Sequence, residues 1–144
     1  MTSDLHARNR ASRDRLAAVI EQLGDRVVEV PGGWTASALL AHIAFWDRLA
    51  IVRLEKYLRD GEQPLTAPPA MTDLTNGAGI RQWKDTPPAA AARQAHDAAA
   101  ALDKLVESLA PDKLAALKKL DRPQLYDRTD HRKLHLDEIE RALR

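Results

Sequence analysis

Two histidines, His131 and His135, lie four residues apart in the segment DHRKLHLDEI near the end of the chain. If this segment is helical, the two rings lie one above the other on the same helix face. We expect them at the middle of its inner face, with Leu134 and Ile139 on the two flanks. Two imidazole nitrogens in that arrangement can bind one metal ion from the same side. The spacing by itself is equally compatible with two histidines that share a helix face by chance.

A third histidine strengthens the metal interpretation. His42 falls between Leu39 and Trp46 on the predicted inner stripe of an earlier helix. A single buried histidine is usually bonded to a hydroxyl or carbonyl group, because each ring nitrogen needs a partner. Three neutral imidazoles that converge from two helices leave a further position for water or substrate. That arrangement is typical of catalytic zinc, and it also suits nickel or ferrous iron.

The pair does not belong to a metalloprotease motif. That motif reads His-Glu-x-x-His, in which the glutamate activates water on the metal. In this chain Arg132 follows His131. The two remaining histidines, His6 and His96, fall on the flanks of their predicted helices, and we expect them at the surface.

Glu138 lies three residues after His135 and almost in line with the histidine pair. It could serve as a fourth ligand, as a hydrogen-bond partner of a metal-binding histidine, or as a catalytic general base. The alternative is a surface glutamate that pairs with Arg141 or Arg132. Asp127, one turn before the pair, is a weaker candidate for the same roles.

Composition limits the possible classes of protein. The 144 residues predict a single domain over residues 1–144, and the 22 Lys and Arg against 21 Asp and Glu give no excess charge for nucleic acid or an acidic membrane. Four arginines near the start are interpreted as a solvated helix face: Arg8, Arg10, Arg13 and Arg15. Without cysteine, disulfides and thiolate chemistry are excluded. We see no signal peptide or membrane span and expect a cytoplasmic protein.

The elements that position these residues are predicted to be helices almost throughout. The expected ranges are about Ser3 to Gly24, Thr35 (as N-cap) to Asp60–Gly61, Thr86-Pro87-Pro88 to about Leu109, a short helix in DKLAALKKL, and a last helix from between Pro123 and Thr129 to the end. Residues 62–85 are rich in Pro, Gly, Thr and Asn and predict a long connection with a short helical turn near Ile80 to Trp83. The β-rich stretch RVVEV is too short and isolated to start a sheet.

These elements predict an all-α fold. The short connection between the first two main helices favours antiparallel neighbours, whereas residues 62–85 are long enough to return the chain along a helix. A four-helix bundle with one long crossover satisfies both conditions.

Two segments resemble the DinB-like superfamily. GWTASALLAHIAFWDRL (Gly33 to Leu49) resembles its second-helix signature, a tryptophan and a Ser/Thr cap followed by a histidine seven or eight residues later. HRKLHLDEIERAL (His131 to Leu143) resembles its fourth-helix signature, His-x3-His followed by Leu and Ile. The resemblance is clearest to the branch of small single-domain members that includes the colibactin-resistance proteins.

The resemblance implies an up-down-down-up bundle with a divalent metal bound by His42, His131 and His135. Many members form dimers, which implies a homodimer here. Some relatives are thiol-dependent transferases or isomerases, others resemble hydrolases, and others have no known activity. The family gives no reason to expect DNA binding.

Three functions remain open at this stage. The first is a metal-dependent enzyme that activates water or a thiol for hydrolysis or thiol transfer on a small molecule, with Glu138 as candidate catalytic residue. The second is a non-catalytic bundle that binds a small molecule or metal in a stress response. Trp34, Trp46 and Trp83 could line its apolar pocket, although each is also explained as core or interface. The third is a plain bundle whose inward histidines bond to each other and to water.

Overall fold

The computed structural model describes residues 2–144, with side chains from Asp4 onward, and confirms an all-α fold. Its elements, in chain order, are α1 (Thr2–Leu23), β1 (Glu29–Val30), β2 (Trp34–Thr35), α2 (Ala36–Asp60), α3 (Pro69–Trp83), α4 (Pro88–Glu107), α5 (Pro111–Lys118), the 3-10 turn η1 (Pro123–Leu125) and α6 (Thr129–Leu143). The short helix in DKLAALKKL is confirmed as α5, and the last helix begins within the expected range.

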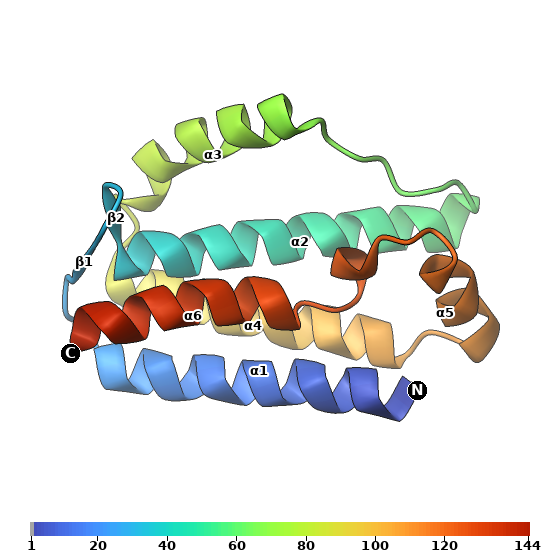
Figure 1. Cartoon of the computed structure of the whole chain (residues 1–144), viewed down its shortest axis with the longest axis horizontal. Coiled ribbons are helices and arrows are strands. Elements are labelled where there is room, and N and C mark those ends of the chain that lie inside the picture. The colour runs from blue at the N-terminus through green and yellow to red at the C-terminus, as the bar shows by residue number, and fades with distance from the viewer. Residues whose placement is uncertain (1) are drawn as a thin grey trace.

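Four long helices lie side by side, and α3 runs along the outside of α2 (Figure 1). In that view α1 and α6 run from right to left, whereas α2 and α4 run from left to right. The most extensive packing is between α2 and α4, and α1 packs against both α4 and α6. Within the described residues, none of the helices has the length and apolar content needed to cross a membrane.

The helix that carries His42 is fixed at both ends as predicted. Thr35 adopts an extended conformation and its hydroxyl accepts a hydrogen bond from the Ala38 backbone N–H at 3.1 Å. At the other end Gly61 has φ +74°, a left-handed conformation, and its N–H bonds to the Tyr57 carbonyl. The Thr35 hydroxyl pairs with a free backbone N–H at the start of the helix, and Gly61, which has no Cβ, adopts the left-handed conformation that ends it.

The prediction that RVVEV is too short and isolated to start a sheet is wrong, because its last two residues form one strand of a small β-hairpin before α2. Glu29 and Val30 pair antiparallel with Thr35 and Trp34. The turn between the two strands uses Gly32 and Gly33, both at positive φ. The pairing is only two residues long on each side, but it fixes Trp34 at the start of α2.

The crossover between α2 and α4 differs from the prediction. Instead of a short turn near Trp83, it contains the 15-residue helix α3. The segment lacks a clear apolar stripe because most of this helix is exposed. It is held by Trp83, which is buried against Gly79, where a Cβ atom would lie 2.3 Å from the indole ring. Trp46 adds a hydrogen bond from its indole N–H to Asn76 Oδ1 at 2.9 Å.

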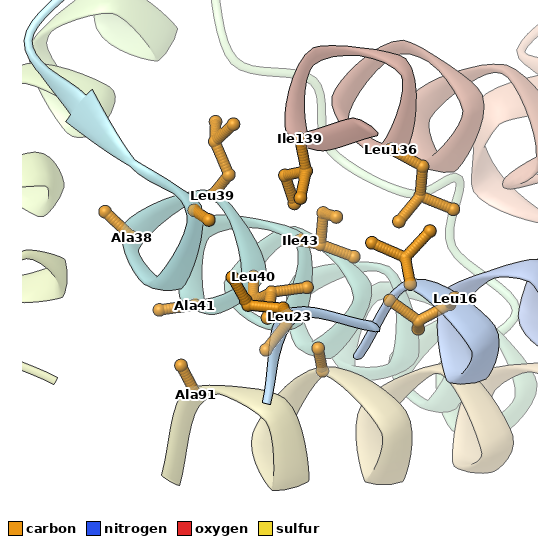
Figure 2. Packing of buried hydrophobic residues seen from close by; sticks show 14 of the residues in the cluster. Leu16, Leu23, Ala38, Leu39, Leu40, Ala41, Ile43, Ala91, Leu136 and Ile139 are labelled. Atoms are coloured by element: carbon orange, nitrogen blue, oxygen red, sulfur yellow. The ribbon is translucent and has the colours of Figure 1, made fainter. Parts of the chain in front are cut away.

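The next helix, α4, begins close to the predicted residue. Its N-cap is Pro87, without a side-chain hydrogen bond, rather than Thr86. Its buried face consists mainly of alanine, so α2 can approach closely. Figure 2 shows the leucines and isoleucines of α1, α2 and α6 that fill the space above it.

The inner face of α6 is centred differently from the prediction. Its fully buried side chains are Arg132, Leu136 and Ile139, each 0% exposed. The two histidines lie half-buried at the edge of this face, and Leu134 beyond them is 55% exposed. The prediction that the histidines form the centre is therefore wrong. The face is rotated because Arg132 points into the bundle toward a buried aspartate.

The four arginines of α1 lie on a partly solvated face, since Arg8 and Arg10 are exposed and Arg13 and Arg15 are half-buried. Each forms an ion pair with an acidic residue outside α1: Arg8 with Asp127, Arg10 with Glu107, Arg13 with Asp103, and Arg15 with Asp137 and Glu140. These contacts join α1 to α4, to α6 and to the residues just before α6. Acidic residues of the same chain therefore partly balance the charge of these arginines.

Candidate metal centre

The three predicted histidines converge at the seam between α2 and α6. His42 projects from α2, and His131 and His135 project from α6 one turn apart. The Nε2 atoms of His42 and His131 are 3.3 Å apart, and the three ring centroids lie 4.7–5.3 Å from one another. One nitrogen from each ring lies within 4.8 Å of the other two. Two nitrogens on one tetrahedral zinc ion, each about 2.0–2.1 Å from it, are roughly 3.3 Å apart.

All three rings are held in the neutral form. Burial is the main cause of the lowered pKa of His42, about 3, and of His131, about 2. The neighbouring Arg128 lowers both pKa values further, and His135 shares the same burial effect. Each ring therefore keeps a lone pair at neutral pH. Neutral imidazole is the form that binds metal.

Glu138 orients His135. Its Oε1 lies 2.9 Å from His135 Nδ1 and accepts the proton of that nitrogen. The opposite nitrogen, Nε2, is then free to bind an ion. A carboxylate behind a histidine is the usual outer partner of a metal ligand, because it fixes the tautomer and makes the ring more basic. The predicted alternative, pairing of Glu138 with Arg132, does not occur, since Arg132 is committed elsewhere.

His131 Nδ1 faces a hydrogen-bond donor, whereas His135 Nδ1 faces an acceptor. The Nη2 of Arg128 lies 3.0 Å from His131 Nδ1. A guanidinium has only donors, so His131 Nδ1 accepts and the ring proton is on Nε2. That proton points at His42 Nε2, which must accept it. His42 then carries its own proton on Nδ1, which is buried and has no partner among the described residues.

These hydrogen bonds decide how well the site fits a divalent ion. His135 offers a free lone pair on Nε2, whereas the Nε2 lone pair of His42 accepts the His131 proton and becomes free once that hydrogen bond breaks. His131 offers a lone pair on Nε2 once the Arg128 hydrogen bond breaks and the ring proton moves to Nδ1. The donor set is that of an open zinc, nickel or iron site. The three residues fit such an ion, with one rearrangement at Arg128.

Arg128 belongs to a buried network that the sequence analysis missed. Its Nε donates to Asp47 Oδ1 at 2.8 Å, and Asp47 is fully buried. Arg132 binds Asp103 with both terminal nitrogens, at 3.1 and 2.8 Å, and lies 3.6 Å from the second oxygen of Asp47. The sequence feature that could have revealed this network is the four-residue spacing of Arg128, Arg132 and Leu136, which places all three on one helix face. Charged helix residues are seldom buried, so the pattern favoured the surface.

The three tryptophans surround His42. Its ring lies edge-on to Trp34, Trp83 and Trp46, with centroids 5.3, 5.2 and 6.3 Å away. Trp34 and Trp83 also stack on each other. Trp34 and Trp46 also line a cavity that opens over the histidines, whereas Trp83 does not. The three indoles give His42 apolar neighbours.

A cavity of about 470 Å³ opens over the histidines. Its lining includes all three rings, Glu138 and Arg128. A substrate of modest size could therefore reach the exposed edge of the histidine cluster.

The remaining candidate residues lie outside this cavity. Asp127 accepts a hydrogen bond from the Thr129 backbone N–H and pairs with Arg8. His96 is exposed, and His6 is half-buried on α1.

Comparison with known proteins identifies the family. The family model described as the DinB superfamily matches residues 8–132, which include all of α2 and the first of the two α6 histidines. No curated protein and no solved structure matches the chain significantly. The match spans well over half of the sequence. The chain belongs to the DinB superfamily.

Proposed function

We propose that the protein is a divalent-metal-dependent enzyme that acts on a small molecule, with His42, His131 and His135 as the metal ligands. The observation that carries the proposal is the convergence of three neutral rings from two helices. One nitrogen from each ring lies within 4.8 Å of the other two, so the three rings together present the donor set of an open metal site. A ligand site explains why all three lie together.

A divalent ion such as zinc, nickel or ferrous iron would lower the pKa of water or of a thiol, which favours hydrolysis or thiol transfer at neutral pH. The chain has no cysteine, so a thiol would come from a cofactor or substrate. Glu138 holds the Nδ1 proton of His135 and also lines the cavity. From there its carboxylate could take a proton from a bound substrate. Trp34 and Trp83 pack against the His42 ring and provide it with apolar contacts.

The wider proposal concerns the whole chain. Residues 1–144 form one domain, an up-down-down-up four-helix bundle of the branch that includes the colibactin-resistance proteins. The helix directions in Figure 1 support this topology. We propose a cytoplasmic homodimer whose partner is a small molecule and which binds neither nucleic acid nor membrane. The pairing of the α1 arginines with acidic residues supports the absence of a nucleic-acid surface.

One observation favours a second function, a non-catalytic binding bundle. The hydrogen bond from Arg128 to His131 Nδ1 stabilises the metal-free arrangement. A protein that releases its metal or binds only an organic ligand would benefit from such a contact. Metal stoichiometry distinguishes the two functions.

The test is elemental analysis of protein purified without an affinity tag, beside His42→Ala and His131→Ala. We expect about one equivalent of zinc, nickel or iron in the wild type and none in either variant, with His96→Ala as the control that keeps its metal. Circular dichroism of the variants would show that the fold is retained. Absence of metal from the wild type, together with no uptake on titration, would reject the enzyme proposal and favour the binding bundle.

A further inference from the structure

A second cavity, of about 190 Å³, lies beside the histidine cavity. Four residues line both of them: Trp46, Thr72, Gln124 and Arg128. The second cavity is therefore the next space that a molecule extending from the metal centre would enter. It lies between α2, the start of α3 and the segment before α6.

The lining of this cavity is cationic. Arg53, Arg122 and Arg128 all contribute to it, and none of its described lining residues is acidic. Three guanidinium groups around so small a space repel one another. The pKa of Arg53 is lowered by burial and by the charges of Arg122 and Arg128, in that order. An arrangement of this kind gains stability from a bound anion.

Two of the three arginines lack a neutralising carboxylate. Among the described residues Arg53 has no hydrogen-bond or ion-pair partner, although it is half-buried. Arg122 donates to the backbone carbonyls of Pro64 and Leu65, which carry no net charge, and its buried Nε has no partner. Only Arg128 is paired with an acid, Asp47. This differs from α1, where Arg8, Arg10, Arg13 and Arg15 each have an acidic partner.

We propose that Arg53, Arg122 and Arg128 form a subsite for an anionic group, a carboxylate or a phosphate, of the molecule whose reacting end lies at the three histidines. The planar fork of arginine suits both anions through paired hydrogen bonds. The shared wall of the two cavities provides the connection between them. This inference rests on the proposed function for the reacting end, while the anion site itself can be measured without metal.

The test uses metal-free protein at low ionic strength and isothermal titration calorimetry with two probes, inorganic phosphate and succinate. We expect saturable binding of at least one probe, with affinity reduced about tenfold or more in Arg53→Gln. Arg59→Gln is the matched control. It removes an arginine six residues later on α2 that is 68% exposed and pairs with Asp60, and it should bind like the wild type.

The outcomes separate the possibilities. Binding of phosphate alone would support a phosphorylated substrate, and binding of succinate alone would support a carboxylic acid. No saturable binding of either probe, or equal binding by Arg53→Gln and the wild type, would overturn the subsite. Zinc titration of the same samples tests the metal centre separately. Retained zinc binding in Arg53→Gln would show that a failed anion site leaves the metal proposal standing.

Discussion

Two polar clusters lie side by side on α6, and they differ in charge, because one consists of ion pairs and the other of neutral imidazole rings. Arg132 uses both terminal nitrogens on Asp103 and further partners on α1, the Asn9 carbonyl and the Ser12 hydroxyl. One residue earlier, His131 shares its two nitrogens with Arg128 and with His42. Each cluster leaves one buried nitrogen without a described partner, Nε of Arg132 and Nδ1 of His42.

The difference separates a structural role from a ligand-binding role. A buried ion pair with several hydrogen bonds fixes the relative positions of the helices, and losing one member leaves an uncompensated charge. A cluster of neutral rings involves no ion pair across the helices, and the cavity over it leaves room for a ligand. We therefore assign stability to the Arg132 cluster and function to the histidine cluster.

The largest expected effect is on the structural cluster. Arg132→Met would leave Asp103 with the partly exposed Arg13 as its remaining ion-pair partner, and Asp47 with Arg128. We expect the free energy of unfolding to fall by about 3–5 kcal/mol in urea denaturation. Arg141→Met, an exposed change on the same helix, should stay within about 0.5 kcal/mol of the wild type. A loss below about 1 kcal/mol in Arg132→Met would contradict the assignment.

The next effect is on metal affinity. Glu138→Ala removes the acceptor of the His135 Nδ1 proton, and we expect zinc affinity to fall about 10–100-fold in a competition with a chromophoric chelator. Asp130→Ala, at an exposed position of the first turn of α6, is the control and should bind zinc normally. Equal affinities in the two variants would show that Glu138 has no part in the site.

Acid should destabilise the metal-free protein through the histidines. The folded-state pKa values of His42 and His131, about 3 and about 2, lie below the unfolded value of 6.5. Between these values the unfolded chain binds protons that the folded chain does not. The free energy of unfolding therefore decreases as the pH falls below 6.5, by at most about 1.4 kcal/mol per pH unit for each histidine.

The comparison of variants isolates this contribution from that of the carboxylates. His42→Gln should show a shallower loss of stability from pH 6.5 to 4 in chelator-treated samples. His96→Gln, at an exposed position, should follow the wild type. Parallel curves for all three proteins would mean that His42 is protonated in the folded state at these pH values.

The smallest effect concerns Arg128. Arg128→Gln removes the donor at His131 Nδ1 and supplies an amide oxygen that can accept there. We expect zinc affinity to increase roughly fivefold, the equivalent of about one hydrogen bond. Asp47→Asn disturbs the same ion pair but leaves Arg128 on His131, so it should give no increase. A decrease in both variants would show that Arg128 acts only through Asp47.

Much of the framework of the site was predictable. Thr35 and Gly61 mark the ends of α2 by chemistry that is local to each residue, and the histidine spacing places two rings on one face of a helix. The convergence of His42 with that pair followed from placing all three rings on inward helix faces, although the α6 pair lies at the edge of its face. These inferences succeed because they depend on short-range geometry.

The remainder depends on contacts between distant segments. The helix α3 is stabilised by Trp83 over Gly79 and by Asn76 on Trp46, which no local pattern reveals. The burial of Arg132 depends on Asp103, 29 residues earlier on α4. For the same reason the donor at His131 was not predicted, since the inward direction of Arg128 is set by Asp47 on α2.

The most direct test of the metal centre is long-range proton–nitrogen NMR of the histidine rings, before and after addition of one equivalent of zinc. In the metal-free protein we expect His135 to carry its proton on Nδ1 and His131 on Nε2. Zinc should shift the Nε2 resonances of His42, His131 and His135 together and leave those of His6 and His96 unchanged. Unchanged resonances of the first three rings at stoichiometric zinc would contradict the account.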